Sequence, residues 1–179
     1  FTQELAETSS GYGYLYRKIV QLAEGKPTMV LQHSLKNTGS RAIETSVYNH
    51  NFLALDQQPP GPGFEITFPF RIQTSRPPND ELAEIRGNQI VYLKRLQDRD
   101  TVAATVEGFS NSASDHQIRL EDKKLAAGMT ISGDRPLSRV FLWSIRTTVS
   151  VEPFVAIAIE PGEEFTWQST YEYYTLDDN

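Results

Sequence analysis

The residues best suited to chemistry in this sequence form one short run, Tyr48-Asn49-His50-Asn51-Phe52. The run follows an alternating segment, residues 42–47, whose period of two would place both aromatic residues and His50 on one face and the two asparagines on the other. An imidazole can donate or accept a proton near neutral pH, and aromatic rings can stack on the apolar faces of a pyranose. The run therefore predicts a sugar-binding cleft in which His50 transfers protons. The alternative interpretation is a buried histidine whose nitrogens are bound by backbone carbonyls.

A second candidate group is the carboxylate of Glu152, which lies in an otherwise apolar stretch just before Pro153. A carboxylate in apolar surroundings costs free energy unless it is paired, and such positions often hold functional groups. Arg146 is close by in sequence. Its guanidinium could pair with Glu152, which would be a structural role, or could bind a ligand hydroxyl.

The other two histidines have less promising surroundings. His33 shares its alternation with Leu31 and Leu35, so we expect it on the inner face of a strand, packed in the core. His116 opens a segment beside Asp115, and we expect a surface histidine paired with that neighbour. The three histidines also lack the i, i+4 spacing of a helical zinc site, so a histidine-based metal centre is not expected.

Composition narrows the function classes. The chain has 179 residues, a formal charge of −6 and a pI near 5.1, which disfavours nucleic acid and anionic membrane surfaces as partners. It has no cysteine, which excludes disulfides and thiolate chemistry. No apolar run approaches the roughly 20 residues needed to span a bilayer. Cysteine-free chains occur in the cytoplasm and among periplasmic or secreted proteins, so composition does not assign a compartment. Because the sequence starts at Phe1, we expect it to be part of a longer polypeptide.

Short alternating segments separated by glycine and proline run through the whole chain, which predicts an all-β, antiparallel β-sandwich in one domain over residues 1–179. Residues 28–36 and 42–47 flank an Asn-Thr-Gly-Ser turn. We expect them to form a hairpin whose second arm delivers His50, with Gly39 adopting a positive φ. Asp177 and Asp178 are expected to form a solvated tail.

Two landmarks in this order resemble the aldose 1-epimerases, the galactose mutarotase-like superfamily. The first is the segment from Met29 to Leu55 with its Asn-His-x-aromatic-Leu ending, and the second is Ile159-Glu160-Pro161-Gly162-Glu163-Glu164-Phe165 before a final strand. The pattern is most similar to uncharacterised bacterial members. The resemblance extends from Gly11 to the end, and it implies the supersandwich fold of that superfamily, here without the N-terminal portion.

The resemblance also implies a mechanism. In that family, the histidine that His50 matches is the general acid towards the ring oxygen of the sugar, and a glutamate from a late strand is the general base at the anomeric hydroxyl. No metal or cofactor is required. Glu152 is the candidate for the base, although the family's glutamate lies farther upstream of the Pro-Gly-Glu turn and Arg146 falls nearly as close to that position. The family's second catalytic histidine and its substrate-binding arginine belong to an N-terminal half that this chain lacks.

Two classes of function follow. The first is a mutarotase-like enzyme with His50 and Glu152 as catalytic residues and Tyr48, Asn49, Phe52, Trp143 and Arg146 as substrate-binding residues. The second is a non-catalytic carbohydrate-binding or accessory domain on the same fold. The expected partners are a small carbohydrate and either the missing N-terminal part of the polypeptide or a second copy of the chain.

Overall fold

The computed structural model describes residues 1–176, and it is built almost entirely from antiparallel strands. Asp177 and Asp178 lie outside the described residues. The elements in chain order are β1 (Thr2–Leu5), β2 (Tyr14–Leu22), β3 (Thr28–Asn37), β4 (Ile43–Val47), β5 (Phe64–Thr67), β6 (Ala83–Arg86), β7 (Gln89–Tyr92), β8 (Thr101–Val106), a 3₁₀ turn (Ala113–Asp115), β9 (Gln117–Asp122), β10 (Ala127–Gly133), β11 (Arg139–Ile145), β12 (Thr148–Ile159) and β13 (Glu164–Thr175). Within residues 1–176, no helix is long and apolar enough to cross a membrane.

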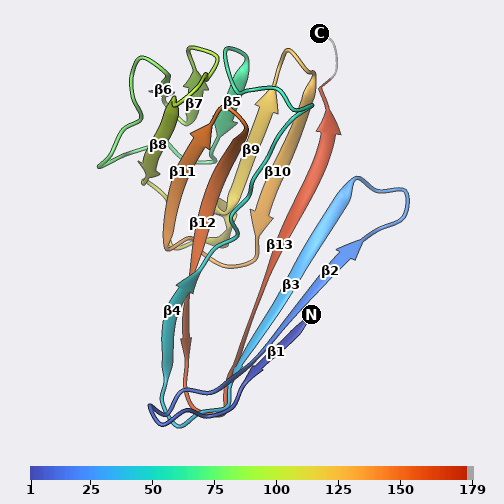
Figure 1. The fold of residues 1–179 in the computed structure, drawn as a ribbon, viewed down its shortest axis with the longest axis vertical. Coiled ribbons are helices and arrows are strands. Elements are labelled where there is room, and N and C mark those ends of the chain that lie inside the picture. Colours follow the sequence, from blue (N-terminus) through green and yellow to red (C-terminus); the bar gives the residue numbers. More distant parts are fainter. Residues whose placement is uncertain (177–179) are drawn as a thin grey trace.

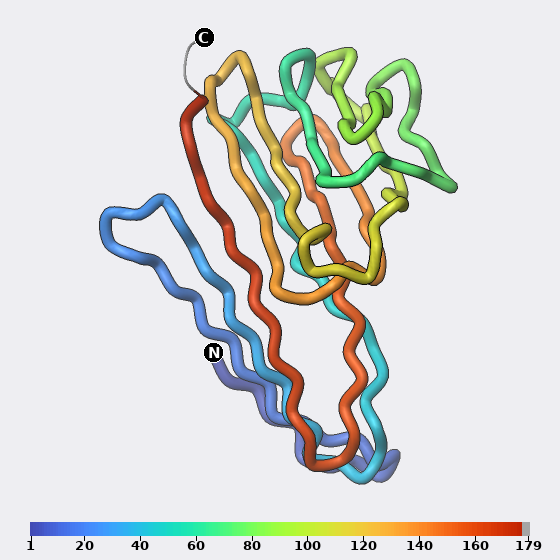
Figure 2. The backbone as a smooth tube through the Cα atoms, turned by 180° about the vertical axis from the view of Figure 1, so that it is seen from behind, coloured from blue at the N-terminus to red at the C-terminus, as the bar shows by residue number. Residues whose placement is uncertain are grey.

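The strands form two sheets. The larger sheet has nine strands in the order β1-β2-β3-β13-β10-β9-β5-β7-β6, and the smaller has four in the order β4-β12-β11-β8. The smaller sheet lies in front of the larger one in Figure 1, and Figure 2 shows the larger sheet from behind, with the N-terminal strands at one side of it. The predicted antiparallel β-sandwich is therefore confirmed.

The predicted hairpin between residues 28–36 and 42–47 is wrong. β3 pairs with β2 and β13 in the larger sheet, whereas β4 pairs with β12 in the smaller one, so residues 38–42 cross between sheets. Gly39 is required there for a reason other than a positive φ, since a Cβ at this position would collide with the backbone of Gly11 and Gly13.

The core between the sheets is divided into two clusters. The larger cluster contains residues such as Ile66, Leu120, Leu142 and Tyr171, and the smaller contains Ile157, Ile159 and Trp167. Alternating burial along β9 and the second half of β12 matches the period of two that these strands need for one face in the core. The segment that carries His50 lies close to both clusters, because Leu53 packs against the larger cluster and Val47 against the smaller one.

Candidate active site

The segment of residues 48–52 continues β4 along β12 without forming a regular strand. Val47 pairs with Val155, and Leu53 forms an isolated bridge with Val149, so the two ends keep one common register. That register places His50 opposite Glu152. Regular pairing is interrupted on both sides. On β12, Pro153 has no N–H to donate. In the segment itself, Phe52 N donates to the carbonyl of His50 and Leu53 N to that of Asn51, which forms two three-residue turns.

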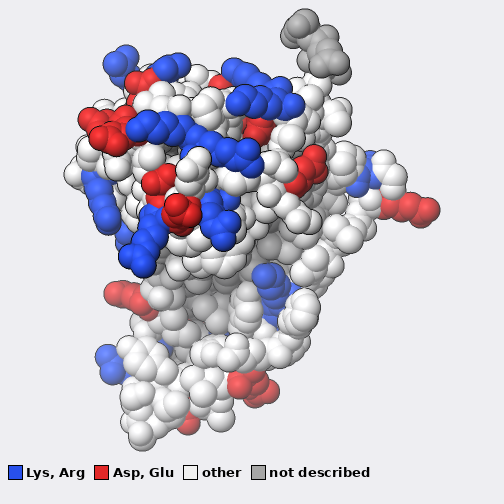
Figure 3. Space-filling view, turned by 45° about the horizontal axis from the view of Figure 1, so that its top comes forward, with Lys and Arg blue, Asp and Glu red and all other residues white. Residues whose placement is uncertain are grey.

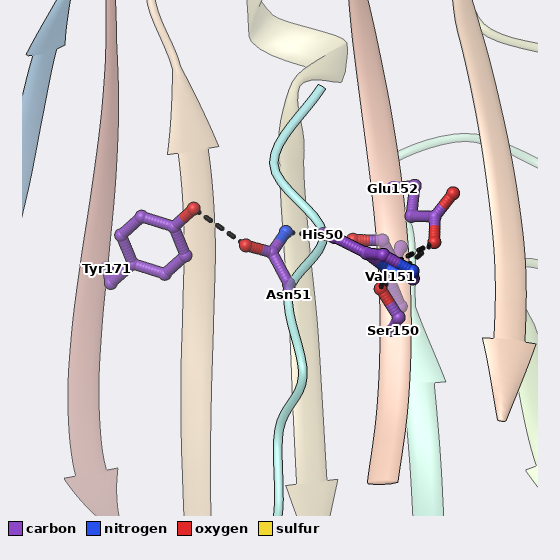
Figure 4. A network of polar contacts seen from close by, with 6 residues as sticks. All are labelled: His50, Asn51, Ser150, Val151, Glu152 and Tyr171. Atoms are coloured by element: carbon purple, nitrogen blue, oxygen red, sulfur yellow. Dashed lines mark hydrogen bonds and ion pairs between the residues drawn. The ribbon is translucent and has the colours of Figure 1, made fainter. Parts of the chain in front are cut away.

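The alternation expected for this segment is preserved despite the turns. The His50 ring lies 4.0 Å from the Phe52 ring and 5.9 Å from the Tyr48 ring, measured between centroids. The two asparagines face the larger sheet, where Asn49 Nδ2 donates to Tyr171 Oη at 3.1 Å and Tyr171 Oη donates to Asn51 Oδ1 at 2.8 Å. Figure 4 shows Asn51 pointing towards Tyr171 and His50 pointing the other way, towards Ser150 and Glu152. The segment therefore presents a histidine with aromatic neighbours on one side and is anchored by amides on the other.

His50 and Glu152 form a close polar pair. His50 Nδ1 lies 2.7 Å from Glu152 Oε1 and 2.9 Å from Ser150 Oγ, and Ser150 Oγ donates to the same carboxylate oxygen at 3.2 Å. The His50 side chain is 43% exposed, whereas that of Glu152 is only 7% exposed. Because Nδ1 is bound to the carboxylate, Nε2 is the nitrogen left to meet a ligand.

Aromatic side chains surround this pair on the outer face of the smaller sheet. Glu152 is opposite Phe141 on β11, and Ser150 is opposite Trp143, so these side chains share one face. The Trp143 ring centroid lies 6.1 Å from those of both His50 and Phe52, and the Tyr48 ring stacks on Phe154 at 4.3 Å. Tyr48 and Phe52 are exposed, so apolar ring faces are available to a ligand beside His50.

A cavity of about 320 Å³ opens on the other side of the same segment. Its walls include Asn49, His50 and Phe52 together with Tyr171 and Lys18 of the larger sheet. Burial raises the pKa of Tyr171 to about 12, so this hydroxyl stays protonated and can continue to donate to Asn51.

Arg146 is not brought to the site in the same way. It lies exposed in the turn between β11 and β12, after the last β11–β12 pair, Ile145 with Thr148. The ion pair of Glu152 is made with His50. The sequence-based alternative of an Arg146–Glu152 pair is therefore wrong, while the proposed contact of Arg146 with a ligand stays a prediction.

The remaining histidines are both buried. His33 is 5% exposed on the inner face of β3, as predicted, and its ring stacks on Trp167 at 4.7 Å. The prediction for His116 is wrong, since it is only 2% exposed and its Nδ1 lies 3.1 Å from the carbonyl of Arg135, whereas Asp115 accepts from Ser110. Within residues 1–176, no three His, Asp or Glu side chains converge as ligands for a metal ion.

Sequence reasoning did not identify Ser150, Phe141, Phe154 or Tyr171 as site residues. Ser150 and Phe154 are two positions before and after Glu152, so the strand period was the signal that could have found them. Phe141 and Tyr171 belong to other strands, and they reach the site through the pairing of β11 with β12 and through the packing of the two sheets.

Comparison with known proteins bears on the fold. No protein-family model matches the sequence, and no curated protein matches it significantly. Solved structures do match. A provisionally assigned aldose 1-epimerase from Klebsiella pneumoniae superposes with a TM-score of 0.70 at 16% identity, covering 98% of this chain and 50% of that one.

Two further structures agree. A provisionally assigned aldose 1-epimerase from Escherichia coli K12 gives a TM-score of 0.64 at 15% identity, covering 98% of this chain and 69% of that one. A galactose mutarotase related enzyme from Lactobacillus acidophilus gives 0.65 at 16% identity, covering 99% and 68%. The chain thus spans half of the length of the Klebsiella protein and about two thirds of the other two. It has the galactose mutarotase-like fold.

Proposed function

We propose that the chain carries the acid/base centre of a mutarotase-like activity, in which His50 and Glu152 transfer protons at the anomeric carbon of an aldose. The ring oxygen and the anomeric hydroxyl of a cyclic aldose are both bonded to C1, so the two groups that exchange protons with them must lie side by side. His50 Nδ1 and Glu152 Oε1 lie 2.7 Å apart, so the two side chains are neighbours, and this proximity is the observation that carries the proposal.

In the proposed reaction, protonated His50 donates its Nε2 proton to the ring oxygen while the Glu152 carboxylate accepts the proton of the anomeric hydroxyl. The bond from C1 to the ring oxygen breaks and leaves an open-chain aldehyde. Rotation about the C1–C2 bond and reversal of both proton transfers give the other anomer. Glu152 Oε1 already binds His50 and Ser150, and Figure 4 shows the other carboxylate oxygen pointing away from His50, so Oε2 is assigned the base role.

The proposed binding residues surround this pair. Phe52, Tyr48 and Trp143 would stack on the apolar faces of the sugar ring, and Asn49 would hold the segment in place through Tyr171. Arg146 in the nearby turn would contact an exocyclic group. Figure 3 shows basic and acidic side chains interspersed over the upper end of the molecule and a mostly uncharged lower part, which favours a neutral sugar over a polyanion.

A non-catalytic carbohydrate-binding role is the second candidate. The observation that favours it is the burial of Glu152, whose side chain is 7% exposed, next to exposed aromatic rings that suit sugar binding without proton transfer.

Anomer exchange of D-glucose and D-galactose, measured by magnetisation-transfer NMR, separates the two roles. An enzyme accelerates exchange in the unmodified chain and loses this acceleration in His50→Asn. A binding domain shifts the resonances of residues 48–52 on titration with sugar but leaves the exchange at the buffer rate. If neither effect is seen with any aldose tested, both candidate functions are wrong.

A further inference from the structure

The phenol of Tyr171 links the segment of residues 48–52 to the larger sheet. Tyr171 lies on β13 and is only 4% exposed. Its Oη accepts a hydrogen bond from Asn49 Nδ2 at 3.1 Å and donates one to Asn51 Oδ1 at 2.8 Å. Asn49 and Asn51 are the residues directly before and after His50. One buried hydroxyl therefore binds both sequence neighbours of the proposed catalytic histidine.

The direction of each hydrogen bond in this series follows from its last acceptor. Asn51 Nδ2 donates to the carbonyl of Val151 at 2.8 Å, and a carbonyl can only accept. The amide oxygen of Asn51 must therefore face Tyr171, so the hydroxyl donates its one proton there and accepts from Asn49. Burial raises the pKa of Tyr171 to about 12, so the hydroxyl keeps this proton at neutral pH.

The series ends on Val151, the residue between Ser150 and Glu152. The side chains of these two flanking residues lie 2.9 and 2.7 Å from His50 Nδ1. Asn51 binds the main-chain carbonyl between them (Figure 4). Two consecutive residues of the segment, His50 and Asn51, thus contact three consecutive residues of β12. A movement of the Asn51 amide would shift the imidazole relative to the carboxylate.

Main-chain pairing does not hold His50 in place by itself. The ladder between β4 and β12 ends before the segment, and main-chain hydrogen bonds to β12 resume only after it. Pro153 of β12, which lies in this interval, has no N–H to donate. The hydrogen bond from Asn51 Nδ2 to the Val151 carbonyl substitutes for a ladder bond here, and the Tyr171 hydroxyl keeps the amide in the orientation that this bond requires.

We propose that Tyr171 is a positioning residue for the proposed activity, acting through Asn51 on His50. Its hydroxyl orients the Asn51 amide, and that amide keeps the imidazole beside Glu152. The inference rests on the proposed function, and Tyr171 itself transfers no proton. Loss of the hydroxyl changes the geometry of proton transfer and not the contacts with the sugar, so it should lower kcat and leave KM nearly unchanged.

Tyr171→Phe removes the hydroxyl and keeps the buried ring. We expect kcat for anomer exchange, measured by magnetisation-transfer NMR at a series of sugar concentrations, to fall by about ten- to hundredfold with KM within about twofold, as for a small displacement of a catalytic group. The imidazole ¹⁵N resonances of His50 should shift as well. The matched control is Tyr173→Phe, since Tyr173 lies two residues farther along β13 and lines the same 320 Å³ cavity but is exposed. It should leave the rate and the resonances unchanged.

A double-mutant cycle tests whether the phenol acts through the amide. Asn51→Ala removes the amide and should itself lower kcat by at least as much as Tyr171→Phe. In the Asn51→Ala background, adding Tyr171→Phe should cost less than about twofold, because residues that act in one network are not additive. Losses that multiply would show that the phenol acts by another route and would contradict the proposal.

Two other results would overturn the positioning role. The first is an unchanged kcat in Tyr171→Phe together with unchanged His50 resonances. The second is a lower unfolding temperature without any change in those resonances, which would leave Tyr171 with a structural role only. If the unmodified chain does not accelerate anomer exchange, the proposed function is wrong, and the His50 resonances of Tyr171→Phe still decide whether the phenol keeps the imidazole beside Glu152.

Discussion

The histidine on the outside of the sandwich and the two histidines inside it occupy opposite kinds of environment. The His50 side chain is 43% exposed and lies 2.7 Å from a carboxylate oxygen, whereas His33 and His116 are buried and their hydrogen-bond partners are a hydroxyl and a carbonyl. A charged partner and an open side suit a ring that gains and loses protons, while neutral partners and burial hold a ring in its neutral form. The same side chain is thus placed for proton transfer in one region and for packing and hydrogen bonding in the other.

The largest expected effect is the loss of anomer exchange when His50, on the outside of the sandwich, is replaced. His50→Asn should lower the acceleration of anomer exchange by about 10²–10⁴-fold, the range typical of a lost general acid, with no change in thermal unfolding. The matched control is His33→Asn, which should leave the exchange rate unchanged but lower the unfolding temperature, because it removes a ring packed against Trp167. NMR exchange rates and calorimetry measure the two effects. If both variants lose activity equally, the contrast between the regions is wrong.

A second substitution tests whether Glu152 transfers a proton or only orients His50. Glu152→Gln keeps the shape and one acceptor for His50 Nδ1 but removes the proton acceptor, and we expect a rate lower by about 10²-fold or more. Ser150→Ala, which removes one hydrogen bond to each partner, should cost only a few-fold. A Glu152→Gln rate within a few-fold of the parent would leave Glu152 as a positioning residue.

Acid should lower the stability of the folded chain through the buried histidine His33. Burial, and secondarily the charge of Lys18, lower the pKa of His33 to about 4 from its ordinary 6.5. Between pH 4 and pH 6.5 the unfolded chain therefore binds more protons at His33 than the folded chain does. The contribution of neutral His33 to the free energy of unfolding is full above pH 6.5 and is lost as the pH falls through 4. We expect on the order of 2 kcal/mol less stability at pH 4 than at pH 7 from this residue. Urea unfolding at both pH values should show it, and His33→Gln should flatten the dependence.

The smallest expected effects are on sugar affinity, from substitutions of the exposed ring of Phe52 and of Arg146 in the β11–β12 turn. Phe52→Ala should weaken sugar affinity by about three- to tenfold, in line with the worth of one aromatic contact, and should barely alter stability because Phe52 is exposed. Arg146→Ala should change affinity by less than about threefold, as for other solvent-exposed charges. Titration by NMR measures both. An Arg146 effect larger than that of Phe52 would place the ligand nearer the β11–β12 turn than His50.

The fold and the orientation of the key segment could be predicted because they depend on local patterns. Alternation alone placed His33 inside and separated Asn49 and Asn51 from His50. The link between β3 and β4 could not be predicted, since a turn sequence does not specify which sheet receives the next strand. The burial of His116 depends on Gly133 in another strand, and the partners of His50 lie far along the chain, with Ser150 separated from it by 100 residues. Such contacts leave no local signal.

The shared register at the two ends of residues 48–52 has a consequence for how this protein can vary. Val47 with Val155 and Leu53 with Val149 fix the number of residues between them. Inserting or deleting one residue would rotate every following side chain to the opposite side, turning the imidazole inward and an amide outward. Homologues and engineered versions that keep the imidazole outside should therefore all retain five residues in this interval.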